Sequence, residues 1–201
     1  MIEFFQKTYY GNTIGEWLIA FSLILASVIV SRILFWIISR GFRLLTRKTR
    51  TQLDDIIINQ IDEPIVAAFL VFGIRLSVNT LTISEGAKMW LESVFSFSFT
   101  LIVAWLITRL YISLHEQYLV PLSQKSHTDV DDMLLPVLKS GIRTIVWTIA
   151  IIVGLNNAGY NVGAILAGLG LGGLAFALAA QDVVANFFGG ITIFVQRPFT
   201  I

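Results

Sequence analysis

The chain has 201 residues, of which 56% are hydrophobic and 13% are charged, and its mean hydropathy is +0.78. Ordinary soluble domains carry about 25% charged residues, so this composition excludes a typical soluble domain and indicates an integral membrane protein. The net charge of +1 argues against a nucleic-acid partner, and the absence of cysteine excludes disulfides, thiolate metal sites and cysteine nucleophiles.

A short polar and aromatic segment, residues 1–13, precedes the first apolar run, Trp17 to Ile38. This run is long enough to cross the hydrocarbon core of a bilayer. A signal peptide is the competing interpretation, but a basic cluster follows the run where a small-residue cleavage site would be needed. Basic residues beside a span indicate its cytoplasmic end. The cluster consists of Arg40, Arg43, Arg47, Lys48 and Arg50.

Three further spans are predicted before residue 156, at Pro64–Ile83, Trp90–Leu114 and Pro136–Leu155. With the first, they make residues 14–155 a set of four outer transmembrane helices. Basic residues are alternately frequent and rare in the successive loops. This alternation predicts five spans in total, with the N-terminus outside the cell and the C-terminus in the cytoplasm.

Two similar segments precede the second and fourth spans. Thr51-x-x-Asp54 and Thr128-x-x-Asp131 both have the form of a capping box at a helix start. Paired acids also suggest catalysis, but the capping interpretation is favoured, because acids stabilise helix N-termini. His115 and His127 are predicted to be solvated loop residues. We therefore expect no catalytic residues, no metal site and no cofactor.

Arg75 is predicted to be the one charge deep within a span, about 16 Å along the helix from Pro64 at 1.5 Å per residue. Charged side chains inside a membrane are costly and are candidates for function. An arginine that reaches a lipid phosphate or a polar cavity is the structural alternative. We interpret Arg75 as a candidate tension sensor.

The last apolar stretch, Val162 to Ala180, is rich in glycine and alanine and begins the segment 156–201. At 100° per residue, its small residues fall on two flanks of a helix, and small flanks let membrane helices pack closely. If both neighbours are copies of the same helix, the contacts close into a ring. A glycine-rich core helix of a monomeric bundle is the alternative. The flanks comprise Gly168, Gly172, Ala175 and Ala179 on one side and Gly173, Ala177 and Ala180 on the other.

Between the flanks runs a front face that would line the axis of such a ring. On it, Leu174 and Leu178 lie one turn apart and would form two apolar collars, which close a water path by dewetting. The hypothesis is therefore a pore with its constriction at these two leucines. The remaining front positions, predicted to line the pore, are Gly163, Ala167, Gly170 and Gln181.

A single straight helix from Val162 to Gln196 would be about 50 Å long, which exceeds the thickness of a bilayer. We therefore predict a break at Gln181-Asp182, where polarity first appears and where Asp can begin a new helix. The second helix is amphipathic and suits the membrane surface or a pore mouth. Gly189 and Gly190 are further candidates for a hinge.

These residues resemble the pore helix of the small-conductance mechanosensitive (MscS-like) channels. The resemblance covers Gly168–Gly173, Ala179-Ala180-Gln181-Asp182, Asn186, Gly189-Gly190 and Arg197-Pro198-Phe199. It implies that Leu174 and Leu178 are the gating leucines and that seven chains form the ring. It also implies a bacterial inner membrane and a cytoplasmic domain beyond the residues of this chain. Asp182 departs from the family pattern, in which the best-known member has a kink glycine.

The predicted fold is an all-α integral membrane protein with five transmembrane helices, the last a kinked Gly/Ala-rich pore helix, in a homo-oligomeric ring. The predicted function is a mechanosensitive channel that opens under membrane tension and releases ions and small solutes in hypo-osmotic shock. Its expected partners are further copies of the chain, membrane lipids, ions and solutes. Two alternatives remain: a secondary transporter built on the repeated hairpins, and a membrane anchor that does not conduct.

Overall fold

The structure is a computed structural model that describes residues 6–45, 52–123 and 129–196. The chain divides into two units, Met1–Tyr160 and Asn161–Ile201. The boundary therefore lies a few residues beyond the predicted limit of the outer helices at residue 155. The elements of the first unit are β1 (Thr8–Tyr9), β2 (Asn12–Thr13), α2 (Ile14–Leu45), α3 (Gln52–Asn79), α4 (Glu85–Leu114), the π-helix η2 (His115–Leu119), α5 (Val120–Ser123) and α6 (Asp129–Asn157).

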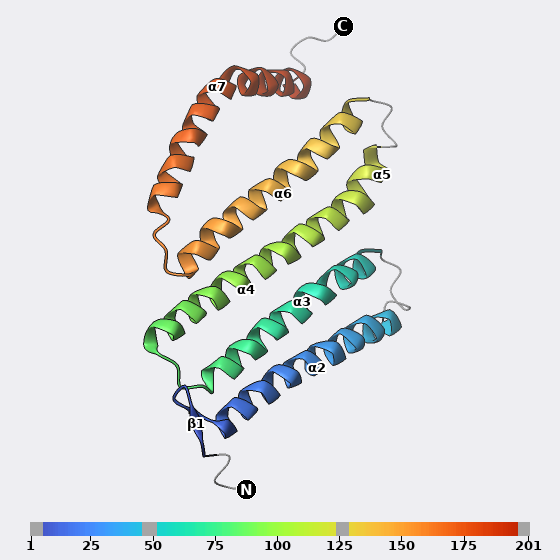
Figure 1. Cartoon of the computed structure of the whole chain (residues 1–201). Coiled ribbons are helices and arrows are strands. Elements are labelled where there is room, and N and C mark those ends of the chain that lie inside the picture. The colour runs from blue at the N-terminus through green and yellow to red at the C-terminus, as the bar shows by residue number, and fades with distance from the viewer. Residues whose placement is uncertain (1–5, 46–51, 124–128, 197–201) are drawn as a thin grey trace. The chain divides into compact units, whose positions relative to one another are not determined.

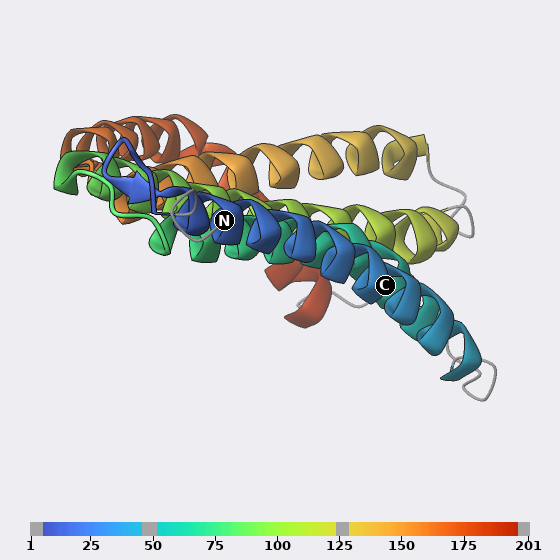
Figure 2. The ribbon, with the colours of Figure 1, turned by 60° about the horizontal axis from the view of Figure 1, so that its bottom comes forward.

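The four long helices of the first unit form a row. Helix α2 packs against α3, α3 against α4, and α4 against α6. Figure 1 and Figure 2 show the same order from two sides, with each helix beside its neighbour in sequence. A row of helices has no enclosed centre, and large apolar side chains stay exposed on it, such as Phe21 at 60% and Ile29 at 57%. Such surfaces suit lipid as the surrounding solvent.

Small side chains set the distance between α2 and α3. A Cβ atom added to Gly73 would overlap the Cβ of Ser27, so the two helix backbones approach closely at this point. One turn further on, the hydroxyl of Ser77 donates a hydrogen bond to the Ala20 carbonyl oxygen at 2.6 Å. Small residues and interhelical hydroxyl bonds of this kind hold helix pairs together in membranes.

Four helices are long and apolar enough to cross a membrane among the residues described: Ile14–Ile37, Glu85–Ser123, Leu134–Asn157 and Gly163–Gln196. The predicted second span corresponds to α3, which is not among these four. The predicted total of five spans therefore stays a prediction. The all-α membrane architecture is confirmed.

The spans predicted to begin at Pro64 and Pro136 start within longer helices, since Pro64 lies inside α3 and Pro136 inside α6. Proline inside a helix removes one hydrogen bond and crowds the carbonyl group four residues earlier. Pro64 is fully buried, so packing offsets that loss. Within the described residues the two helices begin at Gln52 and Asp129, inside the predicted capping boxes. The first residues of these boxes, Thr51 and Thr128, lie outside the described residues.

The prediction that His115 is a solvated loop residue was wrong. It is 2% exposed, and its Nε2 lies 3.0 Å from the carbonyl oxygen of Leu135 in α6. Helical structure continues from α4 directly into η2, so His115 faces a neighbouring helix instead of a loop. His127 lies outside the described residues.

Candidate functional site

The candidate site is α7 (Gly163–Gln196), the only long helix of the second unit within residues 161–196. Its start is fixed locally, because the side-chain Oδ1 of Asn161 accepts a hydrogen bond from the backbone N–H of Gly163 at 2.8 Å. The N–H of Leu166 bonds to the carbonyl of Val162, which completes the first turn. An asparagine in this position satisfies a backbone donor that a helix start otherwise leaves unpaired.

The predicted break at Gln181-Asp182 does not interrupt the helix, which continues through both residues to Gln196. The helix contains no proline from Gly163 to Gln196, so its backbone hydrogen bonds can continue through Gln181 and Asp182. Figure 1 shows that the ribbon of α7 changes direction partway along its length while staying helical. Whether the pore helix is kinked at Gln181, Asp182, Gly189 or Gly190 stays a prediction.

The predicted constriction residues lie on one side of α7. Leu174 and Leu178 are 59% and 64% exposed within the chain, and no residue of α7 is buried. In a continuous helix these leucines share a face with Gly163, Ala167, Gly170 and Gln181, because each of the six falls within about 80° of arc at 100° per residue. The predicted front face is therefore compatible with the helix, and its role in lining a pore stays a prediction.

The flanks of α7 are open. A Cβ atom added to Gly168, Gly172 or Gly173 would meet no atom within 4 Å among the residues described. The predicted packing partners Ala175, Ala177 and Ala179 are likewise exposed. Glycine lowers the stability of a helix interior by about 1 kcal/mol relative to alanine. Glycines with open space around them therefore lower the helix stability of α7 without improving packing inside the chain.

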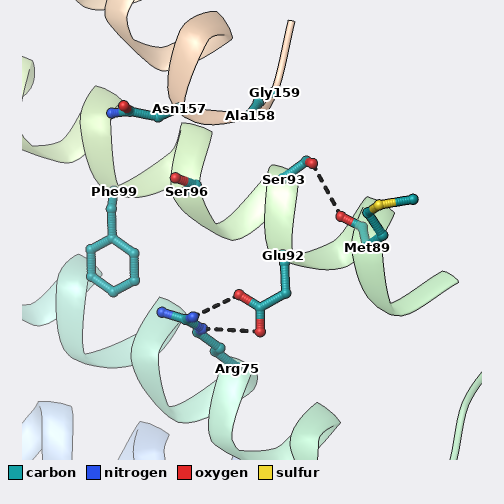
Figure 3. A pocket seen from close by; sticks show the side chains of 9 residues that line it. All are labelled: Arg75, Met89, Glu92, Ser93, Ser96, Phe99, Asn157, Ala158 and Gly159. Atoms are coloured by element: carbon teal, nitrogen blue, oxygen red, sulfur yellow. Dashed lines mark hydrogen bonds and ion pairs between the residues drawn. The ribbon is translucent and has the colours of Figure 1, made fainter. Parts of the chain in front are cut away.

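Arg75, the candidate sensor, forms an ion pair. Its Nη2 lies 2.6 Å from Oε2 of Glu92 in α4, and its Nε donates to Oε1 at 3.4 Å. Figure 3 shows this fork beside a cavity of about 380 Å³, which Ser93, Ser96 and Asn157 also line. Because α3 ends at Asn79, Arg75 lies near a helix end and not deep in a span as predicted.

A second charged group joins α3 and α4 towards their opposite ends. Arg109 pairs with Glu63, donates to Oε1 of Gln60 at 3.0 Å and lies 5.5 Å from the ring centre of Trp105. Along α3 the two acid–base pairs are about 18 Å apart at 1.5 Å per residue, and along α4 about 26 Å. The apolar part of this helix pair is thus bounded by ion pairs at both ends.

Sequence reasoning missed both pairings. Glu63 and Glu92 were not singled out, although each lies near the end of an apolar run. The available signal was the presence of one acid and one base in each of the two adjacent runs. Antiparallel packing of neighbouring helices brings such residues together, but the partners follow only once the helix ends are known.

Comparison with known proteins relates the chain to membrane channels. The family model for mechanosensitive ion channel transmembrane helices 2/3 matches residues 141–181, which cover most of α6 and the first half of α7. This match includes the two leucines of the candidate constriction. No solved structure matches the chain.

Relatives match nearly the whole chain. It is 32% identical over 196 residues to the small-conductance mechanosensitive channel MscMJ of Methanocaldococcus jannaschii, covering 96% of this chain and 55% of the relative. It is 31% identical to the large-conductance mechanosensitive channel MscMJLR of the same organism, covering 94% and 53%. It is 30% identical to the MscS family protein YhdY of Bacillus subtilis, covering 78% and 42%. The chain thus spans about half the length of these relatives.

Proposed function

Because this chain belongs to the MscS family of mechanosensitive channels, we propose that it forms the membrane part of a channel that opens under tension. The channel would release ions and small solutes when a cell meets hypo-osmotic shock. No catalytic step or cofactor is needed for this function, since opening a water-filled path is sufficient.

The observation that carries the proposal is that no residue of α7 is buried. Its 34 residues include an apolar window with a mean hydropathy of 2.0, of which 0% is buried. One side carries leucines, and two others carry glycines with open space around them. A helix with two small-residue flanks can accept two close neighbours, and copies of the same helix satisfy both flanks in a closed ring.

In the proposed ring, seven copies of α7 place Leu174 and Leu178 around a central axis. The two leucine layers exclude water in the closed state, because a narrow apolar passage dries spontaneously. Helices α2 to α6 meet the surrounding lipid. Tension favours whichever state has the larger area in the membrane plane, in the same way that a ligand favours the state it binds better.

The proposed orientation follows from the basic residues. The end of α2 leads into a cluster that contains Arg47, Lys48 and Arg50, so this end would face the cytoplasm of a bacterial cell. The hairpin β1–β2 would then lie outside, and the end of α7 would lie inside. In this arrangement a kink near Gln181-Asp182 would turn the second half of α7 along the cytoplasmic membrane surface.

Asp182 would then surround the cytoplasmic mouth of the pore, where a ring of carboxylates favours cations. We expect Asp182→Asn to move the reversal potential in a salt gradient towards that of a less cation-selective pore. Asn186→Asp, one turn further along α7, would restore a ring of charge. An unchanged reversal potential in Asp182→Asn would reject this part of the proposal.

The experiment that tests the function is patch recording of the purified protein, reconstituted in liposomes, under graded suction. We expect currents that begin at a reproducible suction and disappear when it is released. Empty liposomes provide the control. Silence at every suction up to membrane rupture would support the anchor hypothesis, whereas substrate uptake without unitary currents would support a transporter.

A further inference from the structure

The turn of the N-terminal hairpin contains a tyrosine at a position where the backbone conformation favours other residues. Strands β1 and β2 pair in antiparallel register, with Thr8 opposite Thr13 and Tyr9 opposite Asn12. The two residues between them, Tyr10 and Gly11, both have positive φ angles, of 52° and 82°. Such turns prefer Asn or Gly, and a bulky residue at positive φ is strained. Tyr10 is 95% exposed, so packing within the described chain does not offset this strain.

The hairpin is nevertheless held firmly against the loop between α3 and α4. The side-chain amide of Asn12, 1% exposed, donates to the carbonyl of Thr82 at 2.9 Å and accepts from the N–H of Thr82 at 2.6 Å. The hydroxyl of Thr82 also donates to Asn12 Oδ1, at 2.7 Å. The Asn12 side chain therefore donates to and accepts from the backbone of Thr82, as a neighbouring β-strand would, and links two segments that are 70 residues apart in sequence. Buried amides with all these bonds made are costly to disrupt.

The hairpin is also joined rigidly to α2. The N–H of Thr13 donates to Glu16 Oε2 at 2.7 Å, and the N–H of Glu16 donates to Thr13 Oγ1 at 3.2 Å, which forms a reciprocal capping box. The indole Nε1 of Trp17 donates to the carbonyl of Tyr9 at 3.2 Å. The hairpin, the start of α2 and the α3–α4 loop are therefore one connected structure, from which the two tyrosines project.

Aromatic residues gather at this end of the first unit. Tyr9 is 56% exposed, Trp90 in the second turn of α4 is 63% exposed, and Trp17 lies in the first turns of α2. Tyrosine and tryptophan concentrate at membrane–water interfaces, because an apolar ring and a polar group prefer the boundary between acyl chains and headgroups. The helices that continue from this end are long enough to cross the bilayer.

We propose that the β1–β2 hairpin is an interfacial lipid anchor, in which Tyr9 and Tyr10 insert among phospholipid headgroups at the acyl boundary. The Asn12–Thr82 contact transmits this fixed depth to the α3–α4 loop. The anchor fixes the depth of the hairpin and of the α3–α4 loop, whereas the apolar helices stay inserted without it, and the proposal holds whether or not the protein conducts. The hairpin would bind the phospholipid interface itself, and no single lipid species is required.

The absence of cysteine makes the test direct, because a single introduced thiol can be labelled specifically. Thr8→Cys carries a nitroxide on an exposed strand residue and leaves both tyrosines in place. In phosphatidylcholine–phosphatidylglycerol liposomes, relaxation by oxygen and by a water-soluble nickel complex reports the depth of the label. Ile29→Cys, exposed in the middle of α2, provides the deep reference.

We expect the Thr8 label to lie between water and the Ile29 label in its ratio of oxygen to nickel accessibility. Replacing both tyrosines with serine should lower this ratio at position 8 by about twofold, because the apolar rings no longer hold the hairpin in the interface. The Ile29 label should keep its ratio, which shows that the helices remain inserted. A Thr8 label that is as accessible to nickel as a label in water, with or without the tyrosines, would overturn the anchor.

The contact with the loop is tested separately. Asn12→Ala should broaden the depth distribution and raise the mobility of the Thr8 label, whereas Asn79→Ala, the same change at an exposed asparagine of α3, should alter neither. If Asn12→Ala leaves the label unchanged, the hairpin does not transmit its depth through Thr82 and that half of the proposal is wrong.

Discussion

Small residues serve different purposes in the two units of the chain. In the first unit, the space beside Gly73 is filled by Ser27 of the neighbouring helix. In α7, the spaces beside Gly168, Gly172 and Gly173 are open among the described residues. The same kind of residue therefore completes a contact in one unit and leaves a surface available in the other. A small-residue flank indicates close packing, but only the structure shows whether the partner belongs to the same unit.

The largest effect on gating is expected from substitutions on the front face of α7. Replacing Leu174 or Leu178 with serine should wet the proposed constriction, so the channel should open at much lower suction and slow the growth of cells that express it. Leu169→Ser makes the same chemical change on the opposite face of α7 and is the matched control. Suction thresholds in patch recordings, together with growth curves, provide the measurement.

If the front-face and back-face variants have equal thresholds, the front face does not line a pore and the contrast between the units loses its functional meaning. A normal threshold in Leu174→Ser alone would place the constriction at Leu178. A leak in Leu169→Ser alone would mean that the helix is rotated relative to the proposed axis.

The second prediction concerns the filled space in the first unit. Gly73→Ala should reduce the free energy of unfolding by about 1–3 kcal/mol, because the added methyl group forces α2 and α3 apart. Gly141→Ala in α6 meets no atom within 4 Å of the described chain, and alanine's better helix propensity should make it neutral or stabilising by up to about 1 kcal/mol. Unfolding in mixed detergent micelles, with increasing dodecyl sulfate, compares the two. Equal stabilities would show that α2 and α3 can separate freely.

Sequence reasoning recognised the long helices because uninterrupted apolar runs of this length have few other structures available to them. The grouping of the front face of α7 depends only on the helical repeat, and its role in lining a pore stays a prediction. The predicted spans begin at Pro64 and Pro136, whereas the described helices begin earlier, at Gln52 and Asp129, next to the predicted capping boxes. An apolar run shows which part of a helix can lie in a membrane, but it does not show how far the helix extends beyond the run.

The pairings were harder to predict for a different reason. Whether Arg75 reaches lipid or Glu92 depends on the register of α3 against α4, and that register is fixed by tertiary contacts such as Arg109 with Gln60. His115 was misread because the polar sequence after α4 suggested a loop, whereas the helix continues as η2. The neighbours of α7 cannot be obtained from one chain at all.

The third prediction compares two buried polar residues, Thr108 of α4 and His115 of η2. Nε2 of His115 has a partner in the Leu135 carbonyl while its Nδ1 is buried without one, and the single hydroxyl of Thr108 is buried without any hydrogen-bond partner among the residues described. His115→Phe should lower the free energy of unfolding by about 1 kcal/mol through loss of that bond. Thr108→Val removes an unpaired hydroxyl at nearly constant volume and should be neutral or stabilising by about 1 kcal/mol. The same micelle assay measures both, and destabilisation by Thr108→Val would mean that its hydroxyl is bonded in the assembled protein.

The smallest effect is expected at the Arg75–Glu92 pair, whose side chains are 42% and 37% exposed. Exposed ion pairs contribute about 0–1 kcal/mol to stability, so a double-mutant cycle with Arg75→Gln and Glu92→Gln should give a coupling energy in that range.

Gating measurements on the same variants distinguish the two roles proposed for Arg75. If the pair itself matters, both single variants should shift the suction threshold equally and the double variant should shift it no further. If Arg75 senses tension through lipid, Arg75→Gln should shift the threshold while Glu92→Gln leaves it in place. Unchanged thresholds in all three variants would remove Arg75 from the sensing mechanism and leave the pair as a local link between α3 and α4.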